Sequence, residues 1–384
     1  MKRILLASTA IAFVGGAASA ELTWSGAATF EYVTGGDAGV TNAGQATTET
    51  REEGFDWGVD INAALSMDLD NGLNVTVGAE LDLVDDEVNG TGSLDVSDFV
   101  LSLSGETASL HVGDTNTAAA THWSAAGDME SDGFSAQDGG AGDVILRGDI
   151  AFGDVDASVS YYIGDRDGGA TAGYQGTTAE LTQLSVGVSA DLGGVTAKLA
   201  YQEEGEALDA VADYTRNQIL GLSVSGTAAG LSWTVATVTK SGLAAAADET
   251  STGVKVSYPV GDVTLSAYYV SEDAGNGDAN MGVSIDYASG PLTIGVDFED
   301  DQGNDGVAVD GKYDLGNGLE LIAGFQDGDN RDDDGIYLGG NYDLGGGASL
   351  SLVHVDLDET RTGDGEYMSG DWEDGTTIAL SFSF

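Results

Sequence analysis

Residues 21–33 read ELTWSGAATFEYV, and their apolar and polar side chains alternate with a period of two. Trp24 and Phe30 fall on one face of this stretch, whereas Ser25 and Glu31 fall on the other. A period of two indicates a β-strand with one apolar face. The stretch is also longer than the roughly 5–6 residues that are usual for strands of soluble proteins. We therefore expect a long, two-faced strand here.

The same pattern returns at residues 55–69, FDWGVDINAALSMDL, where Asp56, Asp60 and Asp68 lie on the polar face. In a soluble β-sandwich such an apolar face would point into the core. In a membrane β-barrel the apolar face points at lipid, and the polar face points at a water-filled lumen. Long strands with carboxylates on the polar face favour the barrel. The sequence thus predicts an all-β, transmembrane antiparallel β-barrel.

Short Gly-, Asn- and Asp-rich turns punctuate the rest of the chain, as tight hairpins require. They fall at residues 70–72, 104–107, 152–154, 191–194, 226–230, 259–262, 289–291, 313–318 and 342–347. Longer acidic segments lie between them, such as residues 34–54, 164–179 and 356–375. Short turns at one end and long loops at the other are typical of outer-membrane barrels. Nine hairpins, with a first and a last strand, predict up to twenty strands.

Composition narrows the class further. The chain has 59 Gly, 2 Pro, no Cys and a formal net charge of −53. Few prolines suit a protein built of hydrogen-bonded strands, and the absence of Cys excludes a disulfide scaffold. The negative charge excludes nucleic acid as a partner. Such acidity also fits a disordered chain or a soluble protein of salty environments, but 41% hydrophobic residues in regular patterns argue against disorder.

Residues 1–20 have the layout of a secretory signal peptide. Lys2 and Arg3 precede the apolar run ILLASTAIAFV, and an Ala-Ser-Ala cleavage site ends at Ala20. A buried N-terminal helix is the alternative interpretation. We expect cleavage near Ala20, and a single barrel domain over residues 21–384.

The last residues, 376–384, alternate as the first strand does, with Ile378, Leu380 and Phe382 on the apolar face. We expect this segment to be the last strand and to pair with the first, closing the barrel. An alternating strand that ends in Phe384 resembles the signal read by the outer-membrane assembly machinery, which is therefore an expected partner.

Two segments carry a family resemblance. Residues 110–118, LHVGDTNTA, and residues 342–349, YDLGGGAS, resemble the general diffusion porins of alphaproteobacteria, of the Rhodobacter kind. The resemblance implies a homotrimer of barrels in the outer membrane, each with sixteen strands. It also implies passive diffusion of small hydrophilic solutes and ions past a constriction loop that folds into the lumen.

The segment 113–143 is the longest stretch without sustained alternation, and loops of this length inside a compact domain are usually functional. We interpret it as the constriction loop; a disordered surface loop is the alternative. Trp123, Met129 and Phe134 are candidates to anchor it by packing. Its acidic residues are Asp114, Asp128, Glu130, Asp132, Asp138 and Asp143.

Four basic residues, Arg147, Lys198, Lys255 and Lys312, fall on the polar face of their strands. We expect some of them to line the pore wall opposite the acidic loop, with a transverse field between. Alternatively, each neutralises one local carboxylate. An acidic lumen concentrates cations and repels anions, so the net charge predicts cation selectivity.

Other functions have little support in the sequence. Enzymatic motifs are absent; the one candidate pair is Ser351 and His354, since outer-membrane phospholipases carry Ser and His on the outer face of a barrel. A secreted calcium-binding solenoid or adhesin requires a fixed repeat, which the drifting turn spacing does not provide. A substrate-specific channel differs from a diffusion channel only in its lumen.

The acidic run of residues 327–334 is a candidate calcium site, since carboxylates are ligands for that hard cation. Its carboxylates belong to Asp327, Asp329, Asp332, Asp333 and Asp334. No EF-hand is completed, because the twelfth position counted from Asp327 is Leu338. We therefore interpret the run as solvated charge and expect EDTA to leave thermal stability unchanged. A lower unfolding temperature in EDTA would instead support structural Ca²⁺.

Overall fold

The computed structural model describes residues 20–34, 54–84, 93–134, 144–163, 181–204, 217–241, 248–273, 275, 277–328, 334–358 and 375–384. This part of the chain contains twenty strands and one short helix. In chain order they are β1 (Glu21–Thr34), β2 (Gly54–Asp68), β3 (Asn74–Val84), β4 (Ser93–Ser104), β5 (Ala108–Gly113), α1 (Ala118–His122), β6 (Ile145–Phe152), β7 (Val155–Ile163), β8 (Leu181–Asp191), β9 (Val195–Glu204), β10 (Asn217–Ala228), β11 (Leu231–Ser241), β12 (Glu249–Val260), β13 (Val263–Glu272), β14 (Asn280–Ser289), β15 (Leu292–Asp301), β16 (Asn304–Gly316), β17 (Leu319–Gly328), β18 (Asp334–Gly345), β19 (Ala348–Asp358) and β20 (Gly375–Ser383). Of the helices in these ranges, none is long and apolar enough to cross a membrane.

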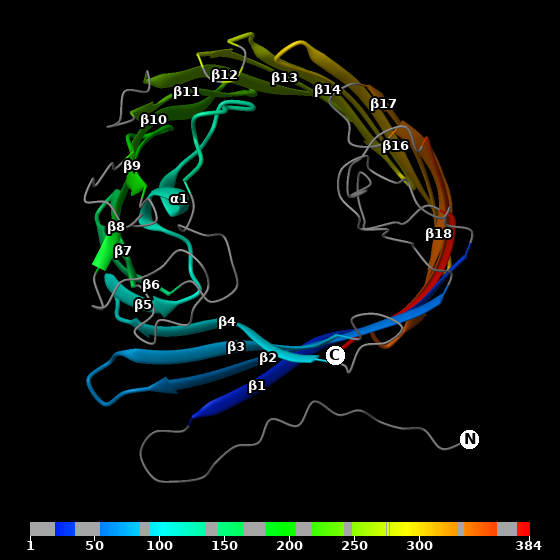
Figure 1. Ribbon diagram of the computed structural model, residues 1–384, viewed down its shortest axis with the longest axis horizontal. Helices are drawn as coiled ribbons and strands as arrows, with labels where there is room; N and C mark the ends of the chain where they lie inside the picture. The colour runs from blue at the N-terminus through cyan, green and yellow to red at the C-terminus, as the bar shows by residue number, and fades with distance from the viewer. Residues whose placement is uncertain are drawn as a thin grey trace, which may run out of the picture.

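The strands form one closed barrel (Figure 1). Each strand pairs antiparallel with the next along the chain, and β20 pairs with β1 to complete the ring. The expected barrel is confirmed, as is the count of twenty strands made from the turns. The sixteen strands implied by the family resemblance are wrong for this chain, because each of the nine predicted hairpins is present.

The closing seam joins β1 to the end of the chain. Thr34 pairs with Thr376, and the register continues to Ala27 opposite Ser383. Beyond the strand itself, Gly26 and Phe384 exchange two backbone hydrogen bonds of 3.0 Å. The prediction that the last strand pairs with the first is therefore confirmed.

The large apolar side chains that are exposed point away from the lumen. Residues that contact the interior helix, such as Ser185, mark the inner face of the wall, and alternation then places their neighbours on the outer face. Trp24 and Phe30 face outward by this register and are 45% and 49% exposed. The outer surface is thus apolar, as a barrel in lipid must be.

Outward-facing aromatic residues lie near the strand ends, the position of the aromatic girdles of outer-membrane barrels. Tyr258, Tyr313 and Tyr342 are 43%, 42% and 42% exposed, each a few residues before a short turn. Trp57 lies outward near the other end of β2 and is 37% exposed. These exposures fit side chains at a membrane surface and exclude packing in a protein core.

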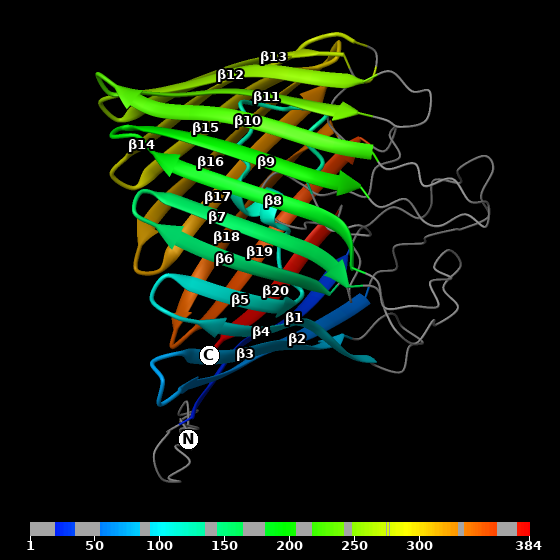
Figure 2. The same ribbon diagram turned by 90° about the vertical axis from the view of Figure 1, so that its left-hand side faces the viewer.

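The short turns gather at one end of the barrel, which we call the short-turn end (Figure 2). One connection at the opposite end departs from the predicted sorting: β15 and β16 are joined by Gln302 and Gly303 alone. Both residues have positive φ, 51° and 90°, as a two-residue hairpin requires. Gly303 N also donates to Asp300 Oδ1 at 2.8 Å. This hairpin was not among the nine predicted ones.

Deleting Phe384 should weaken barrel closure, since Gly26 would lose both backbone partners. With about 0.5–1.5 kcal/mol for each hydrogen bond, we expect the free energy of unfolding to fall by about 1–3 kcal/mol. The free energy of unfolding is measured by urea titration, in which the folded and unfolded fractions are separated by their different migration on a cold SDS gel. Phe384→Ala is the control, because it keeps the backbone bonds; equal losses in both variants would assign the effect to the ring instead.

Candidate functional site

Residues 114–134 leave β5 and run inside the barrel, where α1 lies against β7, β8 and β9 (Figure 1). We call these residues the inward segment. Thr117 caps the helix, with its Oγ1 accepting from Ala120 N at 3.2 Å. The N–H groups of Ala118 and Ala119, which a helix of one turn leaves without partners, donate to Ser160 Oγ and Ser185 Oγ at 2.8 Å. The barrel wall therefore completes the helix.

Glycines on alternate strands let the inward segment lie flat on this wall. Gly187 on β8, Gly221 on β10 and Gly253 on β12 face the lumen. A Cβ added to them would lie 2.2 Å from the Ala118 carbonyl oxygen, 2.4 Å from the Trp123 ring and 2.5 Å from the Ala126 carbonyl oxygen, respectively. These approaches are far below van der Waals contact, so a larger residue at any of them would lift the segment from the wall.

Two of the predicted pore-wall basic residues hold the inward segment. Arg147 donates from Nη1 to Asn116 O at 2.8 Å and to Thr121 Oγ1 at 2.9 Å. Its Nε also lies 3.1 Å from Asp149 Oδ1. Lys198 donates to Ser124 Oγ at 2.7 Å. Both residues lie behind the segment, so neither is among the basic residues that we expected across the lumen from it.

Lys255 and Lys312 face the lumen as predicted and are exposed. Lys312 lies on β16, on the side of the ring away from α1 (Figure 1). Of the four basic residues, Lys312 therefore lies across the lumen from α1. Arg147, paired with Asp149, instead fits the alternative of local neutralisation.

The far end of the inward segment is fastened to β12, β13 and β14. Asn280 is fully buried, and its Nδ2 donates to Asp128 Oδ2 at 3.3 Å and to Glu130 Oε1 at 3.2 Å. Glu130 N donates to Glu272 Oε1 at 3.3 Å, and Ser131 N donates to Ser251 Oγ at 3.1 Å. The Asn280 amide, together with the side-chain oxygens of Glu272 and Ser251, thus fixes the positions of Asp128 and Glu130.

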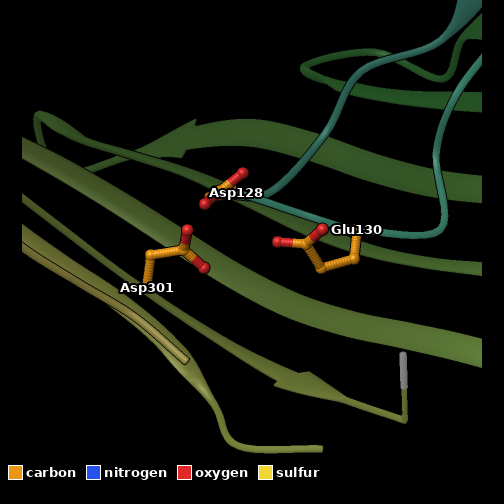
Figure 3. Close-up of side chains that lie close together, drawn as sticks. All are labelled: Asp128, Glu130 and Asp301. Carbon is orange, nitrogen blue, oxygen red and sulfur yellow. The ribbon is translucent and has the colours of Figure 1, made fainter. Parts of the chain in front are cut away.

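Three carboxylates converge at this end (Figure 3). Oxygens of Asp128, Glu130 and Asp301 all lie within 4.8 Å of one another. Asp301 Oδ1 is shielded from solvent and accepts no hydrogen bond from any described residue. Burial raises the pKa of Asp128, and the charges of Asp301, Glu130 and Asp132 raise it further. Oxygens grouped this closely favour a hard cation between them, so this trio could hold a metal ion.

Asp132 has a different environment from the other acidic residues of the segment. Its Oδ2 accepts from Trp123 Nε1 at 2.8 Å, and burial raises its pKa. Trp123 also packs on Phe134, with ring centroids 5.2 Å apart, and Met129 is buried in the same cluster. The predicted packing anchors are therefore confirmed, and Asp132 stabilises the fold of the segment.

The remaining predicted site residues lie apart from the carboxylate trio or outside the described residues. Asp114 begins the inward segment, where its N–H donates to Phe99 O at 2.8 Å. Asp327 lies at the end of β17 opposite outward-facing Val307, not in the lumen. Asp138, Asp143, Asp329, Asp332 and Asp333 lie outside the described residues, as does the side chain of Asp334. The calcium hypothesis for residues 327–334 thus stays a prediction.

The candidate Ser–His pair does not form. His354 faces outward, as predicted, and bonds Thr376 Oγ1 at 3.0 Å. Ser351 lies three residues away along the same strand, so its side chain points to the other face of the sheet. A hydrolytic site of Ser351 and His354 is excluded by this geometry.

Comparison with known proteins agrees with these observations. A sequence profile described as Gram-negative porin matches residues 7–365. The chain belongs to the Gram-negative porin family. This porin is therefore an outer-membrane channel and not an enzyme.

Solved structures similar to this porin include two double mutants of Rh. blastica porin. The mutant with an introduced lysine is 14% identical, with a TM-score of 0.42, and the alignment covers 95% of this chain and 100% of that chain. The mutant with an introduced tryptophan is 12% identical, with a TM-score of 0.43 and the same coverage. A search of curated proteins found no match.

Asn280, Glu272 and the three wall glycines were not predicted from the sequence. The glycines leave a weak signal, since each interrupts the polar face of a strand without lying near a turn. Asn280 leaves none, because nothing near it in the sequence marks a partner 150 residues away. Asp301 was not predicted either.

Gly253→Ala should loosen the inward segment, because its Cβ would meet the Ala126 carbonyl oxygen. Overpacking of this kind typically costs about 1–3 kcal/mol. We expect a lower unfolding temperature together with a larger single-channel conductance, both measured on purified protein. The matched control is Gly78→Ala on β3, since no atom lies within 4 Å of its Cβ position. Unchanged conductance in Gly253→Ala would show that the segment does not limit the pore.

Proposed function

We propose that this porin is a cation-selective diffusion channel for small hydrophilic solutes, with the inward segment as its constriction. The observation that carries the proposal is the convergence of Asp128 and Glu130, both exposed, with Asp301 on the lumen side of the barrel. Fixed carboxylates at a narrow point of a pore raise the local concentration of cations and repel anions. The chemistry is therefore physical selection during diffusion, with no bond made or broken.

The contacts of the basic residues also support selectivity for cations. Arg147 is bonded to Asp149 and to the inward segment, and Lys198 is bonded to Ser124. Their donor groups are therefore already bonded at the barrel wall, and the charge of Arg147 is paired. The carboxylates at the far end of the segment keep exposed oxygens, so the balance of charge along the segment is negative.

The first strands add negative charge to another part of the lumen. Asp60 on β2 lies directly opposite Asp82 on β3, and both face inward. Glu80 lies on the same face, beside Asn62, whose Nδ2 donates to it at 3.3 Å. Like charges placed directly opposite each other repel, and counter-ions from the lumen reduce that cost. This wall therefore also supports a preference for cations.

Further properties follow from the family resemblance and are proposed with it. They are assembly as a homotrimer, recognition of the C-terminal strand with Phe384 by the outer-membrane assembly machinery, and export by a signal peptide cleaved near Ala20. Residues 1–19 lie outside the part of the chain that the structure describes. N-terminal sequencing of the purified protein and its mass in detergent test the last and the first of these.

Neutralising the carboxylate trio should reduce cation selectivity. We expect Asp128→Asn with Asp301→Asn to shift the reversal potential in a KCl gradient toward zero, because two fixed charges leave the constriction. Planar-bilayer recordings of the purified porin measure it. Asp327→Asn is the matched control, since it removes a carboxylate that lies outside the lumen.

Acidification should act in the same direction. The raised pKa of Asp128 means that it takes up a proton at a higher pH than an ordinary Asp, whose pKa is about 3.9. Cation selectivity should therefore begin to fall above that pH and fall less in the double variant. Anion selectivity of the unmodified channel at pH 7 would contradict the proposal.

A further inference from the structure

The basic side chains on the described strands all face the lumen, and most have an acidic neighbour or a bond to the inward segment. Lys240 lies directly opposite Glu249 on the next strand. Lys312 lies between Asp310 and Asp314, which share its strand and its face. Arg147 and Lys198 are bonded as described above. Each of these four cations thus has a carboxylate at a neighbouring position on the lumen face or a bond to the inward segment.

Lys255 differs from the other four. Its cross-strand neighbours are Thr234 on β11 and Tyr268 on β13, and its neighbours on the same face of β12 are Gly253 and Ser257. None of these four carries a carboxylate. The Lys255 side chain is exposed and has no hydrogen-bond or ion-pair partner among the described residues. Its charge is therefore available to a solute.

Hydroxyl groups surround this ammonium. A hollow of about 450 Å³ on the lumen wall is lined by Lys255 together with Thr196, Ser225, Ser232, Thr234 and Ser257. Ser257 Oγ accepts from Ser266 Oγ at 3.0 Å, which leaves the Ser257 hydroxyl hydrogen free to donate. Asp191 also borders the hollow, but its Oδ1 accepts from Gly193 N within its own turn. The wall here offers donors beside a positive charge.

The hollow lies directly beyond the inward segment. Gly253, two residues from Lys255, is covered by the Ala126 carbonyl, and Lys255 is nearer to the turn at Gly261 and Asp262. The ring of Tyr268, opposite Lys255, packs against Gly127 of the segment. A solute that has passed the segment toward the short-turn end therefore meets Lys255 next.

We propose that Lys255 and its hydroxyl neighbours form a binding site for small solutes that carry a carboxylate or phosphate group. An ammonium with three donors and adjacent hydroxyls suits the several acceptor oxygens of such a group. The site is open to the lumen, so binding is weak and the solute leaves again, as passage through a channel requires. It gives an otherwise acidic pore one point that retains organic anions. The inference rests on the proposed channel function.

Succinate and inorganic phosphate are the probes, added separately to both sides of a planar bilayer that holds the purified porin in KCl. Succinate should reduce the single-channel current in a saturable manner, because a bound dianion obstructs the lumen. Lys255→Gln should raise the half-saturating concentration about fivefold, a typical effect for loss of one exposed charged partner. Lys255→Arg should retain most of the binding, and phosphate should follow the same order.

Lys312→Gln is the matched control, because it removes the same charge from a lumen position flanked by two carboxylates. Its half-saturating concentration should equal that of the unmodified porin. Equal losses in Lys255→Gln and Lys312→Gln would overturn the inference in favour of a general charge effect. Channels that open normally but ignore both probes would also overturn it while leaving the proposed function intact. Absence of channels would instead contradict the proposed function.

Discussion

Backbone hydrogen bonding in lipid is the constraint on which the rest of this structure depends. The hydrocarbon core of a membrane offers no partner for an open N–H or C=O group, so a sheet that crosses it must have no edge. Here β1 and β20 remove the last edge, and the pairing extends past the strands to Gly26 and Phe384. A closed ring then fixes which side of every strand meets lipid and which meets the lumen, because side chains alternate without choice along each strand.

This closed ring has a wide interior that its own wall cannot fill, and the inward segment occupies part of it. The buried apolar residues of this half of the molecule, such as Ile219, Val238 and Val270, lie where the segment meets the wall. Polar anchoring directs that packing: serine hydroxyls receive the helix at one end, and buried Asn280 receives the carboxylates at the other. Gly187 and Gly253 let the backbone of the segment approach the wall and Gly221 makes room for the Trp123 ring, so the position of the segment is set by the wall as much as by its own sequence.

The strands and turns could be predicted because their causes are local. Alternation along β1 and β2, and the Gly, Asn and Asp residues of the nine hairpins, act over a few neighbouring residues, and the count of twenty strands followed from them. The resemblance misled on strand number, since related barrels differ by whole hairpins. The docking of the inward segment could be predicted only in part. Its length and its aromatic residues indicated it, but nothing indicated that Arg147 and Lys198 lie behind it, because alternation identifies the face on which a side chain lies and not what covers that face.

The basic residues nearest the inward segment hold it in place and do not face its acidic residues across the lumen. A guanidinium or ammonium that holds a loop by donating to its carbonyl and hydroxyl oxygens has few donors left for a passing ion. The segment is thereby fixed by cations behind it, while its exposed far end carries Asp128 and Glu130 toward Asp301. Position and charge are thus supplied by different residues. Among the lumen-facing cations of the described strands, Lys255 is the exception: its cross-strand and same-face neighbours carry no carboxylate, and Asp191 is the one acidic residue that borders its hollow.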